Sequence, residues 1–269
     1  MTLDTLIDQT PEPRTIRSLT EDLKRLGVDE GMTLLVHSSL SSMGWVCGAE
    51  VAVIQALLNA LGETGTLVMP AQSTDYTDPA SWECPPVPAS WCQTIRDNMP
   101  PFDPHTTPTA RLGRIAACFR TWPGTLRSDH PSLSFCAKGP DAEDILQTHR
   151  LGDSFGLDSP LGALYRRDTR ILLLGVGHEA NTSLHLSECL ADIRPRKRKG
   201  AAIMQNGERA WVWYSDSDYD SDEFPQIGSQ FEKAHPHFVD KGSVGSAESR
   251  LLPMKELVDF ATNWFRIRA

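Results

Sequence analysis

The sequence predicts an α/β layered fold built around a central, mostly parallel or mixed sheet. Helical and strand patterns alternate over the first 70 residues, in the order helix, strand, turn, helix, strand. A further apolar run at 170–176, RILLLGV, leads into a glycine turn and another helical pattern. Chains that alternate in this way usually bury a largely parallel sheet under helices.

Each element follows from local spacing. In residues 15–26 apolar side chains recur at helical intervals, and Gly27 ends the run. An alternating stretch at 201–214, with Asn206-Gly207 at its turn, predicts a β-hairpin. Short apolar runs predict strands at 32–37, 66–70, 134–137 and 170–176. Helical spacing predicts further helices at 50–61, 111–120, 141–149, 182–190 and 252–265.

Residues 71–108 differ from the rest of the chain. Pro, Asp, Ser, Thr and Trp dominate there, and no regular period remains. An irregular stretch of this length is usually functional, so we expect a long active-site loop after the second strand. Residues 1–14 are predicted to be a polar tail. Residues 15–269 are predicted to form a single domain, because no repeat or linker divides them.

Composition and charge exclude several classes of protein. The formal net charge of −9 would repel nucleic acid and attract small polyamines. No apolar run reaches the ~18 residues that a membrane span needs, and the acidic N-terminus lacks the apolar core of a signal peptide. The six cysteines form no CxxC pair and are expected to be reduced thiols. These features predict a cytoplasmic protein with no nucleic-acid or membrane partner.

A serine-rich turn, His37–Gly44, follows the strand at 32–37. Backbone N–H groups and hydroxyls in such a turn can hold phosphate groups, although no Walker GK[ST] follows. The alternative is an ordinary strand-to-helix turn with serine caps.

A second glycine turn, Gly175–Ala180, partly fits the dinucleotide-binding pattern, but no strand ending in an acidic residue follows it. His178 and His185 are too far apart for a zinc-protease motif. In the helix predicted next, His185 and Glu188 share one face. A carboxylate beside an imidazole suits a general base. The alternative is a histidine that only satisfies a hydrogen bond in the core.

Two charged runs leave their roles open. Residues 216–223 place aspartates at alternate positions, but Ser221 and Ile227 replace the glycine and glutamate of a calcium loop. That run is a solvated loop or a rim that attracts cations. The basic run 194–199 is solvated surface or a contact for a cofactor phosphate. No GxSxG motif or activated cysteine is present, so a covalent nucleophile is not favoured.

Ordered blocks along the chain add to this interpretation. They are VHSSLSSMGWVCGA (36–49), GTLVMPAQS (65–73), FDPHTTPTARLG (102–113), FRTWPGTLRSDHPSLSFCAKGP (119–140), SPLGALY (159–165), LGVGHEANTSLHLSE (174–188) and DEFPQIG (222–228). Together they resemble the aminoglycoside 3-N-acetyltransferase family over about residues 15–268. The resemblance implies an α/β/α layered fold. It also implies transfer of acetyl from acetyl-CoA to the 3-amino group of a 2-deoxystreptamine aminoglycoside.

The resemblance further implies roles for individual residues. His185 matches the signature histidine and would act as the general base in a ternary complex, with Thr182 and Glu188 in register and no metal. The coenzyme A loop matches His37, Ser38, Ser39, Leu40, Ser41 and Ser42. Ser134 and Phe135 match the region that lines the pantetheine arm. Acidic candidates for binding the small polycationic substrate are Asp75, Asp78, Asp222 and Glu223.

Ala117 departs from the family pattern, because a glutamate usually precedes the FR block. The acceptor of a family member with this change could be an amine other than an aminoglycoside. A non-catalytic coenzyme A-binding protein is the other alternative. The sequence leaves a monomer and a homodimer both open.

Overall fold

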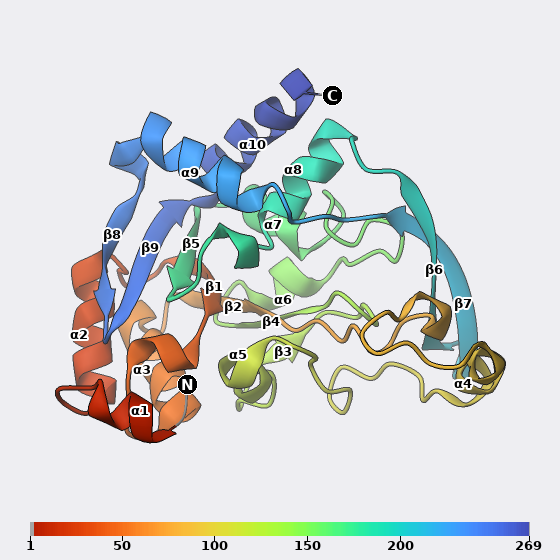
Figure 1. The fold of residues 1–269 in the computed structure, drawn as a ribbon, viewed down its shortest axis with the longest axis horizontal. Helices are drawn as coiled ribbons and strands as arrows, with labels where there is room; N and C mark the ends of the chain where they lie inside the picture. The colour runs from red at the N-terminus through yellow and green to blue at the C-terminus, as the bar shows by residue number, and fades with distance from the viewer. Residues whose placement is uncertain (1–2, 269) are drawn as a thin grey trace.

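The computed structural model describes residues 3–268, and a seven-stranded sheet forms its centre (Figure 1). The three middle strands are parallel: β1 (Thr33–Ser38) lies between β2 (Thr66–Pro70) and β5 (Thr169–Leu174). The flanking strands are antiparallel, so the sheet is mixed. They are β3 (Leu126–Arg127), β4 (Phe135–Lys138), β8 (Asp240–Val244) and β9 (Ala247–Pro253), in the overall order β3-β4-β2-β1-β5-β9-β8.

Successive side chains of the central strands point to opposite faces of the sheet and pack into two separate hydrophobic cores. Leu34 and Val36 of β1 belong to one core, and Leu35 points into the other. The first core is covered by α2 (Ile16–Leu26), α3 (Ala49–Leu61) and α5 (Gly113–Arg120). The second is covered by α6 (Ala142–Leu146), α7 (Pro160–Tyr165), α8 (Leu184–Ala191), α9 (Phe224–Ala234) and α10 (Met254–Arg268). Helices therefore lie on both faces, and the α/β/α prediction is confirmed.

Local signals set the ends of the first predicted helix. The Thr15 hydroxyl accepts a hydrogen bond from the Ser18 N–H (3.1 Å), and the Ser18 hydroxyl accepts one from the Thr15 N–H (2.9 Å). This reciprocal pair satisfies N–H groups that the first turn leaves free. Gly27 ends the helix in the left-handed region, with φ 106°.

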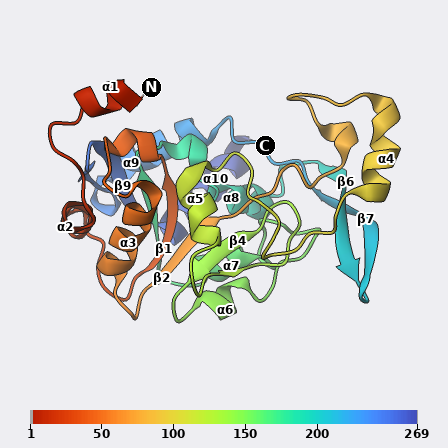
Figure 2. The ribbon, with the colours of Figure 1, turned by 90° about the horizontal axis from the view of Figure 1, so that it is seen from below.

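A β-hairpin and a short helix stand apart from the main sheet (Figures 1 and 2). The hairpin consists of β6 (Arg196–Gln205) and β7 (Glu208–Ser217), and the helix is α4 (Cys92–Asn98). Backbone and side-chain bonds join the two segments: Phe102 N–H donates to the Ala202 carbonyl (2.8 Å), and Arg209 Nε donates to the Met99 carbonyl (2.8 Å). We call this unit the arm.

The hairpin is longer than its alternating stretch predicts. It takes in most of the basic run, because Arg196 to Lys199 form the first residues of β6. It also takes in Asp216, which pairs with Lys197 in register and is fully buried. Neither charged run is therefore simply a solvated loop.

The N-terminal segment is more structured than a polar tail. Residues Leu3–Asp8 form α1. The Trp45 N–H donates to the Thr10 hydroxyl (2.9 Å), and Arg14 forms a β-bridge to Val46. Met1, Thr2 and Ala269 lie outside the described residues. Short 3-10 turns complete the chain: Leu40–Met43, Pro79–Ser81, Ala89–Trp91, His178–Ala180 and Pro236–Phe238.

Within residues 3–268, no helix is long and apolar enough to cross a membrane.

Candidate active site

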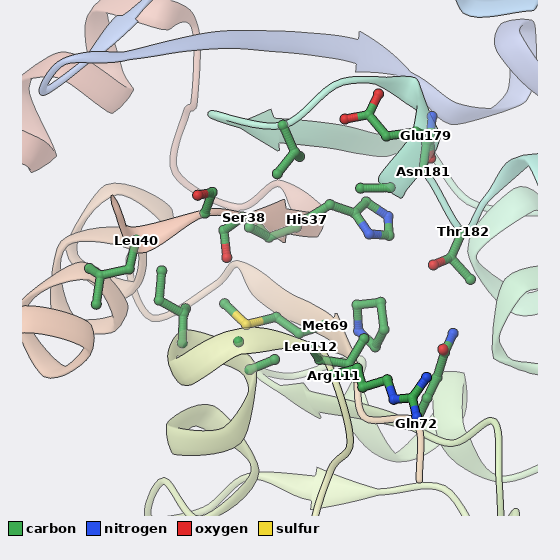
Figure 3. Close-up of a pocket in the computed structure, with 18 of the residues that line it drawn as sticks. His37, Ser38, Leu40, Met69, Gln72, Arg111, Leu112, Glu179, Asn181 and Thr182 are labelled. Atoms are coloured by element: carbon green, nitrogen blue, oxygen red, sulfur yellow. The ribbon is translucent and has the colours of Figure 1, made fainter. Parts of the chain in front are cut away.

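The main cavity opens where the three parallel strands end. The chain leaves β1 toward α3 on one face of the sheet and leaves β5 toward α8 on the other. Loops that diverge in this way leave a crevice at the carboxyl ends of the strands, where α/β proteins bind ligands. The cavity encloses about 700 Å³. Figure 3 shows its wall, built from the segments that follow β1, β2 and β5 and from the start of α5.

The serine-rich turn forms one side of this cavity. Residues His37 to Ser41, which the sequence analysis assigns to a coenzyme A loop, line it. Ser42 does not line it. Its hydroxyl donates to the Gly175 carbonyl (3.0 Å) and to the Ser39 hydroxyl (2.9 Å), and so ties the turn to the end of β5. Gly175 has φ 68°, and a Cβ there would lie 2.6 Å from the Ser42 Cβ. This close approach requires a glycine.

His185 and Glu188 form the predicted pair on α8. His185 lines the cavity, and its Nδ1 lies 2.6 Å from Glu188 Oε2. The Glu188 side chain is fully buried; Arg194 Nε and the Asp220 N–H (3.2 Å) both donate to its Oε1. Because Glu188 engages Nδ1, Nε2 is the nitrogen that His185 offers to a ligand.

Three aromatic rings fix the plane of His185. Phe155 stacks on the imidazole with ring centroids 4.9 Å apart and planes 4° apart. Tyr219 and Phe224 meet it edge-on at 5.2 and 4.8 Å. Phe224 lies in the DEFPQIG block, whereas Phe155 and Tyr219 belong to segments without a regular period. None of these three contacts was predicted from the sequence.

The segment after β5 supplies the wall between His37 and His185. Thr182 lines the cavity. Asn181 lines it too and is fully buried; its Oδ1 accepts from the Ser183 N–H (3.3 Å) and hydroxyl (2.7 Å). The Glu179 carboxylate accepts from the Gly177 N–H (2.9 Å).

His37 is 6% exposed at the end of β1. Burial, and to a lesser degree the charge of His185, lowers the pKa of His37 to about 3. The ring is therefore neutral at neutral pH. Its Nε2 has no hydrogen-bond partner among the described residues.

Ser134 and Phe135 do not reach the cavity. Both are fully buried, and Phe135 belongs to the core beneath the second helical layer. The Ser134 hydroxyl donates to the Ala71 carbonyl (2.8 Å) and accepts from Arg127 Nε (2.9 Å). The residues predicted to line the pantetheine arm therefore support the start of the long loop, and do not line the cavity themselves.

The predicted acidic rim is dispersed. Asp78 pairs with Arg96 at 2.8 Å, and Glu223 pairs with Arg194 at 3.2 Å. Asp222 is exposed and absent from the cavity wall. Asp75 lines a second cavity of about 560 Å³, which shares Arg111 with the first.

The charges that do line the main cavity include two arginines. Arg111 and Arg114 belong to its wall, and Glu179 is the one carboxylate found there among the described residues. Ala117 is exposed on α5 and does not line the cavity, although its neighbour Ala116 does. The long loop contributes Gln72 to this wall and most of the wall of the second cavity.

Comparison with known proteins adds to this geometry. A family model described as aminoglycoside 3-N-acetyltransferase matches residues 35–266. The chain is 45% identical over 261 residues to the SPbeta prophage-derived aminoglycoside N(3')-acetyltransferase-like protein YokD of Bacillus subtilis, which covers 97% of this chain and 95% of YokD. It is 31% identical to aminoglycoside N(3)-acetyltransferase IX of Micromonospora chalcea, with 98% and 97% of the two chains covered.

Solved structures show the same fold. The crystal structure of YokD matches with a TM-score of 0.95 and 44% identity over 97% of each chain. AAC-IIIb, solved as a binary complex with CoASH, has a TM-score of 0.85 and 29% identity over 96% of this chain and 98% of that one. AAC-VIa bound to sisomicin has the same TM-score and identity, over 96% and 99%. The fold and the matches along almost the whole length agree: this chain belongs to the aminoglycoside 3-N-acetyltransferase family.

Proposed function

We propose that this protein transfers an acetyl group from acetyl-CoA to the 3-amino group of a 2-deoxystreptamine aminoglycoside, with His185 as general base in a ternary complex. The observation that carries the proposal is the His185–Glu188 pair at 2.6 Å, at the edge of a cavity formed by the ends of three parallel strands. CoASH bound to AAC-IIIb and sisomicin bound to AAC-VIa support the two substrates.

The cavity suits an anionic co-substrate. Ser39 and Ser41 line the cavity, and so do Arg111 and Arg114, of which Arg114 pairs with Glu50 at 2.8 Å. Coenzyme A carries phosphate groups, which bind to hydroxyls, backbone N–H groups and arginines. These residues would hold its phosphates. The acetyl thioester it carries supplies the activated carbonyl for the transfer.

His185 has the geometry of a base that Glu188 orients. With Nδ1–H donating to Glu188, Nε2 can take a proton from the attacking amine as nitrogen bonds to the thioester carbonyl carbon. The buried Glu188 carboxylate stabilises the resulting imidazolium, and the Phe155 stack keeps the ring in place. When the carbon–sulfur bond breaks, His185 returns the proton to the leaving thiolate. Positioning of the two substrates supplies much of the remaining acceleration.

A second candidate acceptor is an amine with fewer charges than an aminoglycoside. This alternative rests on the cavity wall, where Glu179 is the one carboxylate among the described residues and already accepts a hydrogen bond from Gly177. A polycation binds best where several carboxylates face it. The four acidic residues predicted for that role do not line this wall.

We also propose that residues 15–269 work as a single domain in the cytoplasm, as a monomer or a homodimer. The six cysteines are all free thiols, as proteins of a reducing compartment usually have them.

The test is thiol release from acetyl-CoA with sisomicin, other 2-deoxystreptamine aminoglycosides and simple mono-amines, against a blank without acceptor. The wild-type protein and His185→Gln are compared, with His237→Gln as the control because His237 is exposed and does not line the cavity. We expect release with at least one amine, lost in His185→Gln and kept in His237→Gln. Turnover that survives in His185→Gln would refute the general-base role. Binding of acetyl-CoA without release on any amine would favour the non-catalytic alternative.

A further inference from the structure

Two residues of the main cavity's wall, His37 and Asn181, each carry a buried polar atom without a hydrogen-bond partner among the described residues. Within residues 3–268, the buried side-chain atoms that lack a hydrogen-bond partner include His37 Nε2 and Asn181 Nδ2, and no other such atom belongs to a residue of the cavity wall. Folded proteins pair nearly all their buried polar groups, so an unpaired one needs an explanation. A donor kept free beside a reactive histidine is suited to an oxygen of the substrate.

The orientation of the Asn181 amide follows from its neighbours. Ser183 N–H is a donor and approaches at 3.3 Å, so the atom it meets must be the amide oxygen. The Ser183 hydroxyl, at 2.7 Å, donates to the same oxygen. The nitrogen of Asn181 is therefore the free end, with two hydrogens and no acceptor among the described residues. Ser183 holds the amide as a preorganised donor.

His37 lies beside the segment that carries Asn181. It pairs in parallel register with Leu173, near the end of β5, and the chain after β5 leads to Asn181. Figure 3 shows the His37 ring extending from the end of β1 into the cavity, across from Thr182. Burial keeps this ring neutral. With its proton on Nε2, the ring can donate a hydrogen bond without adding a positive charge beside His185.

We infer that His37 Nε2 and Asn181 Nδ2 form the oxyanion-binding pair of this enzyme, and that they donate hydrogen bonds to the carbonyl oxygen of the acetyl thioester. This inference rests on the proposed acetyl transfer. As the amine nitrogen bonds to the carbonyl carbon, the carbon–oxygen π electrons move onto the oxygen, and the two donors stabilise that negative charge. The charge returns to the carbonyl when the carbon–sulfur bond breaks and the thiolate leaves. Removing one donor of such a pair typically lowers kcat by about 10²–10³-fold.

Substitutions at the two positions distinguish the loss of a hydrogen-bond donor from a loss of side-chain packing. Asn181→Asp keeps the oxygen that accepts from Ser183 and removes the Nδ2 donor. His37→Phe keeps a ring of similar size without the Nε2–H, whereas His37→Gln restores an N–H donor. Thr125→Val is the matched control, because Thr125 Oγ1 is also buried without a partner but lies outside the cavity wall.

Three measurements test the inference. Steady-state kinetics with acetyl-CoA and sisomicin give kcat and KM, and calorimetry gives the affinity for coenzyme A, which has no acetyl carbonyl. Infrared spectroscopy of bound [1-13C]acetyl-CoA reports hydrogen bonds to the carbonyl, because donors lower its stretching frequency. Thermal unfolding of every variant confirms that it is folded.

We expect Asn181→Asp and His37→Phe to lower kcat by about 10²-fold or more, with coenzyme A affinity unchanged within about twofold. The carbonyl frequency should rise toward its value in water in both variants, and His37→Gln should recover most of kcat and of the frequency shift. A wild-type carbonyl frequency in both folded variants would overturn the inference. If the wild-type protein shows the low frequency but does not acetylate sisomicin, the donor pair is supported and only the proposed acceptor fails.

Discussion

Replacing Glu188 by glutamine tests the arrangement around His185 most directly. The substitution keeps the shape of the side chain but removes a charge that is fully buried and meets His185, Arg194 and the Asp220 N–H. An amide cannot stabilise the imidazolium as a carboxylate does, and it can hold the wrong tautomer. The comparable loss in other histidine-dependent enzymes is about 10²–10⁴-fold in kcat, or roughly 3–5 kcal/mol of transition-state stabilisation.

The same change should cost stability. Hydrogen bonds to charged groups contribute about 1.5–3 kcal/mol each, and Glu188→Gln alters three of them, to His185, Arg194 and the Asp220 N–H. A net loss of roughly 3 kcal/mol corresponds to a Tm about 6–12 °C lower for a chain of this size. Glu21→Gln is the control: it breaks an exposed pair with Arg17 at 2.8 Å, which contributes little.

The assay is initial-rate thiol release together with differential scanning calorimetry of both variants. Glu188→Gln with wild-type kcat would refute the orienting role of the carboxylate, even if Tm fell. A large fall in kcat with unchanged Tm would show instead that the buried charge serves catalysis at no net cost to folding. The control should match the wild-type protein in both measurements.

Three further predictions concern single residues. Burial lowers the pKa of His130 to about 3, so the unfolded chain binds a proton below about pH 6.5 that the folded protein does not. Stability should therefore fall by about 2 kcal/mol from this residue between pH 7 and pH 5; His130→Asn should flatten that slope in urea titrations, and an unchanged slope contradicts the assignment. Arg127→Met removes hydrogen bonds to the Thr107 and Ala71 carbonyls and should speed proteolysis within residues 71–108. Mass spectrometry of the fragments measures the cleavage, and cleavage at the wild-type rate would contradict a role of Arg127 in holding this loop. Phe155→Leu removes the stack on His185 and should lower kcat about 2–10-fold, whereas a change confined to KM would argue against a positioning role.

The central strands could be predicted because they are continuous apolar runs. The apolar runs predict strands at 32–37, 66–70 and 170–176, and the structure has them at Thr33–Ser38, Thr66–Pro70 and Thr169–Leu174. Strands buried on both faces need apolar side chains at every position, which is a strong local signal. The edge strand β8, Asp240–Val244, is mostly polar and gave no such signal. Its partner β9 ends in Leu252 and Pro253, which the sequence analysis assigned to the terminal helix.

The ends of the hairpin were missed for a different reason. Charged residues stay in its strands because they pair across the ladder and stack on aromatic rings: Arg198 lies 4.0 Å over the ring of Trp213. Composition alone cannot separate such a strand from a solvated basic run. Strands that are buried along their whole length can therefore be predicted from the sequence. Strands whose polar groups are paired by other segments cannot.

The contact between His185 and Glu188 was predictable, and its surroundings were not. His185 and Glu188 lie on one helix, so their spacing predicted that they meet. The other groups around His185 come from elsewhere: Phe155 precedes His185 by 30 residues, and Tyr219 follows it in the chain after β7. No periodic pattern connects such segments. The acidic residues predicted to bind substrate do not gather in the cavity. A count of charges does not say which carboxylates are already paired within the protein.

Asp216 connects the arm to the surroundings of His185. Its buried carboxylate accepts from the Ser154 hydroxyl (2.5 Å) and the Tyr219 hydroxyl (3.2 Å), and Lys199 Nζ lies 3.5 Å away. Ser154 directly precedes Phe155, and Tyr219 meets the edge of the His185 ring. A buried carboxylate is stable only when all these partners are in place. The sequence left Asp216 as part of a solvated loop or a rim that attracts cations, but its carboxylate is buried inside the protein. There it holds the end of the hairpin and supports two of the aromatic rings that contact His185.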